Sequence, residues 1–236
     1  MEFTFGIITT NGNTDNIKSI VEDIQNLEIP EYEVIVVGGE RISHDKVIHI
    51  PFDDTIRKAW TTRKKNLITE NAHFENIVYA HDYITFDKDW YSGFKKFGND
   101  FDVCMTKIIN ADGTRYRDWL VWPHNDNKMD NIMARQRGCM IPYHLTHLSK
   151  YMYISGAYWV AKRHIMKKYP LDESICWGES EDVVWSKAVR QHSDFKMNTL
   201  SAVIMRKYKD KIFYEADEKT IEDILNLEPI PRRHNS

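Results

Sequence analysis

Short apolar runs alternate with amphipathic segments along the first hundred residues, and this alternation constrains the fold more than any other feature. Four runs have the length and composition of buried strands: residues 3–9, 32–37, 46–50 and 76–80. Residues 13–27 carry apolar side chains at helical spacing, and residues 55–72 predict a longer, polar helix. Strands and helices in this order predict an α/β fold with a mostly parallel central sheet flanked by helices.

Polar residues and glycines follow three of these predicted strands. They are Thr9, Thr10 and Asn11, then Gly38 and Gly39, and finally His81 and Asp82. Because ligands of open α/β sheets bind at the carboxyl ends of the strands, we expect a binding site here. Asp82 is a single carboxylate at the end of a buried strand, which suits either a divalent cation completed by a substrate diphosphate or an ordinary turn.

Two common nucleotide-binding motifs are missing from the sequence. No Gly-x-Gly-x-x-Gly follows the first predicted strand, which argues against a Rossmann dinucleotide site. No Gly-Lys-Ser/Thr is present, which argues against a P-loop nucleotidase. A nucleotide could still bind through the strand-end loops.

The chain changes character near residue 99. Residues 110–150 form a long irregular stretch rich in Trp, His, Arg and Asn, and a stretch of that length is usually a functional loop or lid. Further strands are predicted at 101–109, 151–161 and 199–205, and further helices at 163–169, 181–192 and 219–227.

Residues 177–182, Trp-Gly-Glu-Ser-Glu-Asp, place adjacent carboxylates where a loop becomes a helix. Carboxylates held on a loop by a helix suit a general base that faces a cleft. The same residues also fit a structural role, because Ser180 is a good N-cap and acids in a first helical turn complement the helix dipole.

Two basic blocks allow two interpretations each. The first, within the predicted helix, consists of Arg63, Lys64, Lys65 and Asn66. It is either a solvated helix face or a set of phosphate and base contacts. The second follows the last predicted strand and consists of Arg206, Lys207, Lys209 and Lys211. It is either an exposed basic end or a means of neutralising a leaving diphosphate.

Composition narrows the class of protein. The 236 residues carry a formal net charge of -3, so we expect no nucleic-acid partner. Three widely spaced cysteines indicate a reducing compartment rather than a disulfide framework. The first residues do not resemble a signal peptide, and no apolar run approaches the roughly 20 residues of a transmembrane helix. We therefore expect a soluble, cytoplasmic protein without a transmembrane segment.

Taken in chain order, these motifs resemble the GT-A fold nucleotide-sugar glycosyltransferases, in particular family 2 enzymes and the catalytic core of the β-1,4-galactosyltransferases. The resemblance spans residues 3–211 and rests on short blocks. Residues 9–11 resemble the first nucleotide-binding loop of the family. Lys65 and Asn66 stand where such enzymes often carry an Arg-Asn pair, on the helix before the metal-binding strand.

Three later blocks extend the resemblance. Residues 80–82, Ala-His-Asp, stand at the Asp-x-Asp position that binds metal and nucleotide sugar in the family. Residues 153–156, Tyr-Ile-Ser-Gly, resemble the small-residue segment that lines the donor site. Residues 177–182 resemble the Trp-Gly…Glu-Asp block, in which the Asp is the usual base. The sequence departs from the pattern at Ala80, which replaces the first Asp, and at Lys207, where some relatives place a metal-binding His.

The resemblance implies a single GT-A domain over residues 1–236. Its parts are a nucleotide-binding half at 1–100, an acceptor and catalytic half at 101–212, and a C-terminal helix and tail at 213–236. A smaller acceptor-side sheet and a long loop region complete the expected fold. The implied activity is that of a hexosyltransferase-like glycosyltransferase.

The resemblance also implies an inverting reaction with named residues. The donor is a nucleoside diphosphate sugar, UDP-linked, and the acceptor is a hydroxyl of a glycan, lipid or protein. Asp182 is the expected base, Glu181 the second catalytic residue, and Asp82 the ligand of Mn²⁺ or Mg²⁺. The expected donor contacts are Thr9, Thr10, Asn11, Gly38, Arg63, Lys65, Asn66, Ala80, His81, Asp82, Ser155, Gly156 and Lys207. The expected acceptor contacts are Trp177, Gly178 and Glu179.

Two other functions are compatible with the sequence. Ala80 leaves open a GT-A module that binds a sugar nucleotide or carbohydrate without turnover. A sugar nucleotidyltransferase on the same scaffold is the other alternative, although residues 9–13, Thr-Thr-Asn-Gly-Asn, are a poor version of its Gly-rich, Arg-containing loop.

Overall fold

Four parallel strands form one half of the central sheet. The computed structural model describes residues 1–121, 138–206 and 213–226. The strands are β1 (Phe3–Ile8), β2 (Tyr32–Val37), β3 (Val47–Ile50) and β4 (Asn76–His81), in the order β3-β2-β1-β4. Every residue of β1 and β4 is buried, as expected for near-continuous apolar strands covered on both faces. The carboxyl ends of β1 and β4 therefore lie side by side.

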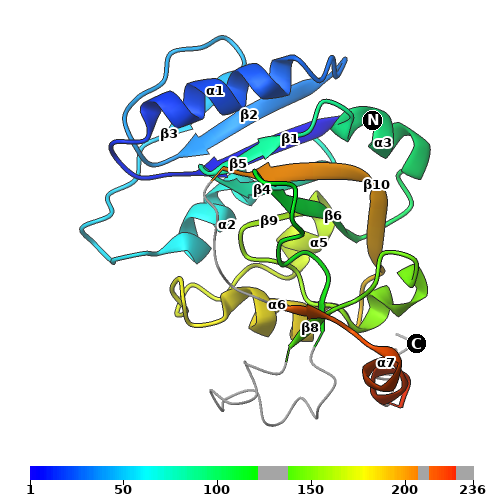
Figure 1. Cartoon of the computed structure of the whole chain (residues 1–236). Helices are drawn as coiled ribbons and strands as arrows, with labels where there is room; N and C mark the ends of the chain where they lie inside the picture. The colour runs from blue at the N-terminus through cyan, green and yellow to red at the C-terminus, as the bar shows by residue number, and fades with distance from the viewer. Residues whose placement is uncertain (122–137, 207–212, 227–236) are drawn as a thin grey trace.

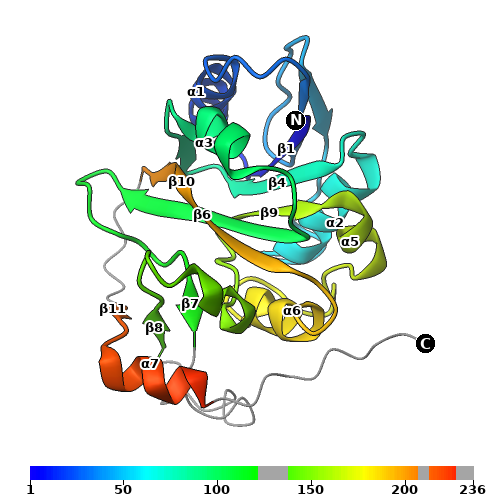
Figure 2. The ribbon, with the colours of Figure 1, turned by 90° about the vertical axis from the view of Figure 1, so that its right-hand side faces the viewer.

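The other half of the sheet mixes directions. The strands are β9 (Tyr158–Lys162), β6 (Val103–Asn110), β10 (Phe195–Met205) and β5 (Ile84–Phe86), in the order β9-β6-β10-β5. β9 runs antiparallel between β4 and β6, β10 is parallel to β6, and β5 is antiparallel to β10. The eight-stranded, mostly parallel sheet confirms the predicted fold class, and it is curled in the views of Figures 1 and 2.

Helices cover the sheet, and alternation along β1 explains which side chains they meet. The helices are α1 (Thr14–Gln25), α2 (Thr61–Asn71), α3 (Trp90–Phe97), α5 (Arg163–Lys168), α6 (Glu181–Val189) and α7 (Glu218–Leu225). Phe3 and Phe5 pack against Trp90 of α3, whereas Gly6 lies under Ile68 of α2. A Cβ at Gly6 would lie 2.3 Å from the Ile68 side chain, so this glycine permits the close approach of α2. Figure 1 shows α1 and α2 on opposite sides of the sheet.

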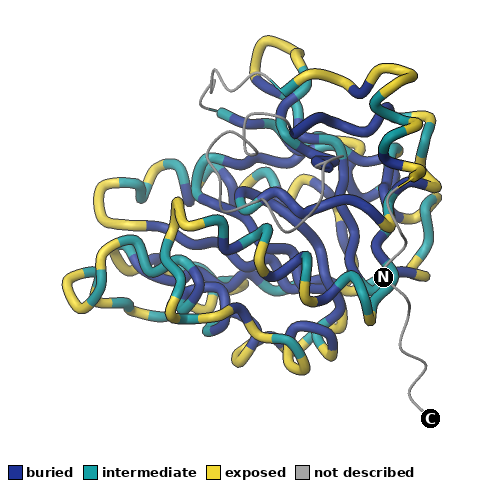
Figure 3. The backbone as a smooth tube through the Cα atoms, turned by 90° about the horizontal axis from the view of Figure 1, so that it is seen from below, coloured by how far each residue is buried: buried dark blue, intermediate teal, exposed yellow. Residues whose placement is uncertain are grey.

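A second, three-stranded sheet lies below the first in Figures 1 and 2 and confirms the predicted smaller sheet. Its strands are β7 (Leu120–Val121), β8 (Cys139–Met140) and β11 (Tyr214–Glu215), in the order β11-β8-β7. Leu120, Met140 and Tyr153 form a small apolar cluster against which Val183 of α6 packs. The 3-10 helix η2 (Thr146–Tyr151) follows β8. Figure 3 shows the buried backbone at the centre of the molecule and the exposed loops at its rim.

Several predicted boundaries are wrong. The helix predicted at 55–72 begins at Thr61, because Ala59 has a left-handed φ of 56° and Trp60 is the N-cap. The strand predicted at 151–161 begins at Tyr158, after the end of η2. β7, β8 and η2 lie in the stretch that was predicted to be irregular, of which residues 122–137 are outside the described residues. β5 and α3 lie in a stretch, 84–97, that no prediction covered.

None of the helices in the described part of the chain is long and apolar enough to cross a membrane.

Candidate functional site

A cavity of about 410 Å³ opens at the carboxyl ends of β1 and β4. Its volume falls within the range of small-molecule sites. The walls come from these strand ends, from the segment before and at the start of α2, and from the loop before α6. The lining residues are Ile8, Thr9, Thr10, Asn13, Asp54, Lys58, Ala59, Trp60, Thr61, Lys64, His81, Asp82, Tyr83 and Trp177.

The strand ends are tied together by polar contacts that the chain supplies from distant positions. Thr9 Oγ1 donates to Asp82 Oδ2 at 2.7 Å, and the Thr9 N–H donates to the Val37 carbonyl at 3.1 Å. Lys64 Nζ donates to the Thr9 carbonyl at 2.6 Å and pairs with Asp54 at 2.7 Å. We call Thr9, Asp54, Lys64 and Asp82 the strand-end region.

Gly38 supports this region from behind. Its φ of 88° and the 2.5 Å distance from an added Cβ to the Thr9 carbonyl both require glycine. Of the other predicted donor contacts near β1 and β4, Thr10 and His81 line the cavity. Asn11 is exposed, and Ala80 is buried within β4.

The adjacent acids Glu181 and Asp182 take different positions at the start of α6. Asp182 is half-buried, and its Oδ2 accepts from the Gly156 N–H at 2.8 Å while its Oδ1 accepts from the Val183 N–H at 2.9 Å. Glu181 is buried, and its Oε1 lies 3.5 Å from Lys65 Nζ. Lys65 Nζ also donates to the Gly156 carbonyl at 3.0 Å. We call Lys65, Gly156, Glu181 and Asp182 the acid-pair region.

Burial dominates the electrostatics of the acid-pair region. It raises the pKa of Glu181, against the opposing charge of Lys65 and with the added charge of Asp182. It lowers the pKa of Lys65, although the charges of both acids oppose this shift. Two carboxylates therefore face one buried ammonium.

A single turn joins the two regions. The Ala157 carbonyl accepts from the His81 N–H at 3.1 Å, and the neighbouring Gly156 N–H binds Asp182. Burial raises the pKa of Tyr83, and the charges of Asp82 and Glu181 both raise it further. Tyr83 lines the cavity and an acid from each region raises its pKa, but Glu181 and Asp182 themselves are not among the residues that line the cavity.

The aromatic residue of the 177–182 block also faces the cavity. Trp177 is 58% exposed and lines the same cavity as Asp82. The backbone N–H of Trp177 donates to the carbonyl of Ala59, just before α2, at 3.0 Å. The other two predicted acceptor contacts, Gly178 and Glu179, are exposed, and Glu179 accepts from the Cys176 N–H.

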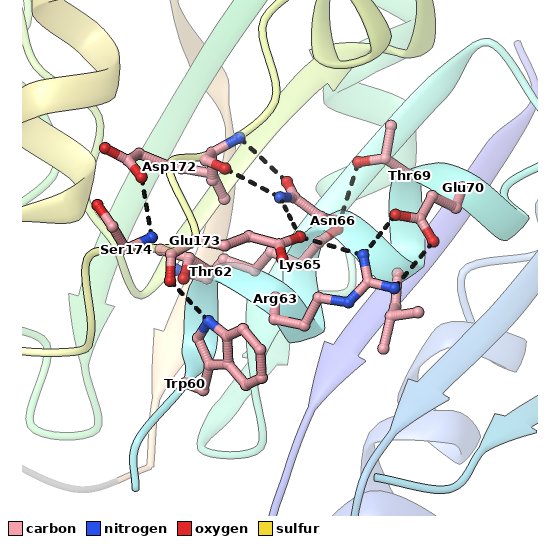
Figure 4. Close-up of polar contacts among 12 residues, drawn as sticks. Trp60, Thr62, Arg63, Lys65, Asn66, Thr69, Glu70, Asp172, Glu173 and Ser174 are labelled. Carbon is pink, nitrogen blue, oxygen red and sulfur yellow. Dashed lines mark hydrogen bonds and ion pairs between the residues drawn. The ribbon is translucent and has the colours of Figure 1, made fainter. Parts of the chain in front are cut away.

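The side chains of α2 hold the segment that leads to Trp177 (Figure 4). Asn66 bonds the backbone of Leu171 in both directions, at 2.9 and 3.0 Å. Trp60 Nε1 donates to the Glu173 carbonyl and Thr62 Oγ1 to the Ile175 carbonyl, each at 2.8 Å. The 171–175 segment is thereby fixed on α2.

Arg63 and Asn66 are thus not brought to the cavity. Arg63 pairs with Glu70 at 2.6 Å and with Glu173 at 3.1 Å. The predicted donor contacts of Arg63 and Asn66 stay predictions. The solvated-face interpretation is wrong for most of this block, because Lys64, Lys65 and Asn66 are buried.

Ser180 stands at the N-cap of α6 as predicted, but it does not cap the helix with its side chain. It has a left-handed φ of 66° and makes no side-chain cap hydrogen bond. Of the remaining predicted contacts, Ser155 is buried in the turn that joins the two regions. Arg206 bonds Ser19 and lies 3.7 Å from Asp23 on α1. Lys207 lies outside the described residues.

Sequence reasoning missed most of the wall contributed by residues 54–64. Asp54, Lys58 and Trp60 all line the cavity. The helix was predicted to begin at residue 55, so residues 55–60 were not recognised as a loop. One signal was available, because Asp53 accepts from the Thr55 N–H in the local turn that Asp-x-Thr favours.

Among the described residues that line the cavity, Asp82 is the carboxylate best placed for a divalent cation, and its Oδ2 also accepts a hydrogen bond from Thr9. Among the described residues, no three His, Cys, Asp or Glu side chains come together as a metal cage. Asp54 lines the cavity too, but it pairs with Lys64, which leaves Asp82. One carboxylate fits Mg²⁺ or a similar ion that takes its other ligands from substrate phosphates and water.

Comparisons with known proteins identify the fold. No family model matches the sequence, and no curated protein matches it. Residues 1–349 of S. aureus TarS, crystallised with UDP-GlcNAc, match 94% of this chain with a TM-score of 0.58 and 13% identity. GalNAc-T7, crystallised with UDP, GalNAc and Mn²⁺, matches 95% of it with a TM-score of 0.60 and 11% identity.

The match covers 64% of that TarS chain and 47% of GalNAc-T7, so this chain spans less than two thirds of either. At this level of identity the comparison shows the fold alone, which is the GT-A fold.

Proposed function

We propose that this protein transfers a sugar from a UDP-linked donor to an acceptor hydroxyl, with inversion at the anomeric carbon. The observation that carries the proposal is the junction of two regions at one turn. The cavity beside Asp82 suits a nucleotide diphosphate, and Asp182 is held to Gly156 of the turn that contacts β4. The similarity in fold to proteins crystallised with UDP supports the choice of donor.

In this proposal the strand-end region binds the donor. Thr9, Thr10 and His81 would contact the nucleotide, with Asn11 at the rim and Gly38 and Ala80 shaping the backbone around it. Ser155 and Gly156 would face the sugar, and Lys207 would approach the diphosphate. Asp82 would hold Mn²⁺ or Mg²⁺, and the ion would supply charge stabilisation for the departing diphosphate.

Asp182 would act as the general base. Each of its oxygens accepts one backbone N–H, which fixes the carboxylate and leaves further lone pairs for the acceptor hydroxyl. As the hydroxyl oxygen attacks the anomeric carbon, its proton passes to Asp182 and the bond to the diphosphate breaks. One base and one displacement give inversion.

Trp177 would bind the acceptor. Its exposed indole at the cavity offers a flat apolar face to a sugar ring, and its backbone is fixed by Ala59. Gly178 and Glu179 would complete this side.

One observation favours a second candidate, a module that binds a sugar nucleotide without turnover. Ala80 stands in the first Asp position, and Asp82 already accepts a hydrogen bond from Thr9. Binding of UDP-sugars with no transfer and no hydrolysis, with Mn²⁺ or without it, would favour this candidate.

The Asp182→Asn variant tests the proposed function. We expect wild-type protein to bind UDP and a UDP-sugar in a thermal-shift screen and to release UDP in the presence of an acceptor. Asp182→Asn should lose about 10²–10⁴-fold in kcat, because an amide cannot act as the base and its single oxygen keeps one of the two backbone hydrogen bonds. It should keep its affinity for UDP, because residue 182 is not among the residues that line the cavity beside Asp82. Asp45→Asn, in the segment between β2 and β3, is the matched control and should keep wild-type kcat. Near-normal transfer by Asp182→Asn would refute the assignment.

A further inference from the structure

Lys65 is a buried cation whose side-chain hydrogen bond and ion pair lie within the acid-pair region. Its side chain is 2% exposed, and its ammonium lies 4.7 Å from the centre of the Trp159 ring. Burying an ammonium is unfavourable unless it is paired and hydrogen-bonded. Lys65 therefore needs a compensating arrangement, which the Gly156 carbonyl and Glu181 provide.

The Gly156 peptide is held from both sides by this arrangement. Its carbonyl accepts from Lys65 at 3.0 Å, and its N–H donates to Asp182 at 2.8 Å. A Cβ at this position would lie 3.0 Å from Asp182 Oδ2 and 3.1 Å from Glu181 Oε1. A side chain at residue 156 would therefore require one or both acids to shift by a few tenths of an ångström.

A second contact binds the same turn to α6. Ser186 Oγ accepts from the Ile154 N–H at 3.0 Å and donates to the Asp182 carbonyl at 2.7 Å. The 154–156 backbone is thus attached to Asp182 twice. Ser186 links it to the Asp182 carbonyl, and the Gly156 N–H binds the Asp182 carboxylate. Lys65 adds the remaining constraint, on the carbonyl of Gly156.

The two acids differ in what they can reach. Glu181 is 6% exposed and points at Lys65, whereas Asp182 is half-buried. A buried Glu with a lysine counter-ion is poorly placed to take a proton from a substrate. Asp182 keeps lone pairs beyond its two backbone hydrogen bonds.

We propose that Lys65 and Glu181 are positioning residues for Asp182. The ammonium of Lys65 fixes the Gly156 carbonyl, the fixed peptide directs its N–H to Asp182, and Glu181 serves as the counter-ion that keeps the ammonium in place. Neither residue contacts donor or acceptor. This inference rests on the proposed role of Asp182 as base.

The test uses a double variant, Lys65→Met/Glu181→Leu, that removes both buried charges together, so neither is left without its counter-ion, and takes the Lys65 donor away from the Gly156 carbonyl. We expect kcat to fall about ten- to a hundredfold, because small displacements of a catalytic group are costly, while the affinity for UDP stays within about twofold. The matched control is Lys162→Met/Glu75→Leu, which removes the buried Lys162 of β9 and its exposed partner Glu75, 3.4 Å away and just before β4. The control should keep wild-type kcat.

Hydrogen exchange gives a readout that does not need activity. In the Lys65→Met/Glu181→Leu variant the Gly156 amide should exchange about tenfold faster than in wild type, because Lys65 no longer holds the peptide that directs this N–H to Asp182. Unchanged exchange would overturn the inference even if UDP transfer were never observed. If wild type fails to bind UDP, the proposed function fails, and exchange at Gly156 still decides whether Lys65 orders the turn.

Glu181→Gln separates positioning from catalysis in case the double variant does not fold. The amide oxygen of Gln can still accept from Lys65, so we expect kcat within about threefold of wild type. A catalytic acid would lose about 10²–10⁴-fold, and that result would overturn the inference. Loss of UDP affinity on substitution of Lys65 would also overturn it, because it would make Lys65 a donor contact.

Discussion

Lys64 and Lys65 are neighbours on α2, yet they serve two different regions of the site. Lys64 bonds the Thr9 carbonyl and Asp54 in the strand-end region, and Lys65 bonds the Gly156 carbonyl and Glu181 in the acid-pair region. Successive residues of a helix point about 100° apart, so one turn of α2 reaches both regions. α2 therefore contacts both regions, through Lys64 at the end of β1 and through Lys65 at the Gly156 turn.

The two regions also differ in their exposure. The strand-end region lines an open cavity, where Asp82 is half-buried and accepts a hydroxyl hydrogen bond. The acid-pair region contains a buried ammonium and a buried carboxylate packed around a glycine. This difference suits a region that exchanges ligands and a region that keeps one geometry. Substitutions in one region should therefore spare the function of the other.

Gly156→Ala should give the largest effect and disturb the acid-pair region alone. The new methyl would crowd Asp182 Oδ2 at 3.0 Å, and we expect kcat to fall about 10²-fold with UDP affinity kept. Steady-state kinetics and titration with UDP measure this. Gly113→Ala, in an exposed turn with a φ of 85°, is strained but should leave kcat unchanged. Equal losses of kcat in both variants would mean that the effect comes from stability.

Asn66→Ala tests whether Asn66, which follows Lys64 and Lys65 on α2, has a structural role. Removing Asn66 leaves the Leu171 backbone without its two partners, and the free energy of unfolding should fall by about 2 kcal/mol. Asn71→Ala, at the exposed end of the same helix, is the control and should cost less. Urea denaturation measures both. A loss of UDP affinity without a loss of stability would instead support the predicted donor contact.

Thr9→Val should weaken the strand-end region and leave the acid-pair region intact. It removes the 2.7 Å hydrogen bond to Asp82. We expect UDP affinity to fall about five- to tenfold with kcat at saturating donor kept. Thr4→Val removes a 2.6 Å hydrogen bond to Glu33 at the other end of β1 and should not change UDP affinity. A larger loss of kcat than of UDP affinity in Thr9→Val would contradict the separate roles of the two regions.

The pH dependence of stability should report the acid-pair region with the smallest effect. Burial raises the pKa of Glu181 in the folded protein, so the unfolded chain releases its proton first as pH rises from the ordinary value of 4.5. The folded state therefore loses stability between that value and the raised pKa. We expect the Lys65→Met/Glu181→Leu variant to gain stability relative to wild type across this window, because it lacks the buried carboxyl. Denaturation at several pH values measures this. A difference in the free energy of unfolding between the two proteins that does not change with pH would contradict the prediction.

The first half of the sheet was predictable from sequence because its signals are local. β1 and β2 are near-continuous apolar runs, and the predicted bounds agree with the structure to within a residue. Strands of two residues, such as β7, β8 and β11, have no such signal, because their partners define them.

The start of α2 and the burial of its lysines depend on distant contacts. Arg57 bonds the Glu173 and Ser174 carbonyls before the helix begins, and no local pattern records this. From the local sequence alone, Lys65 is expected to face solvent. Its burial depends on the contact with Gly156, which lies 91 positions away in the chain. The strand-end residues of the site were predictable from topology, whereas the cavity wall at 54–60 was not.

The most direct test of the account is a crystal structure of the Asp182→Asn variant with a UDP-sugar and Mn²⁺. We predict the diphosphate beside Asp82, with the anomeric carbon facing residue 182 across a gap that holds one hydroxyl, about 3 Å from the residue 182 side chain. A donor bound with its sugar directed away from α6, or bound outside the cavity beside Asp82, would contradict the account.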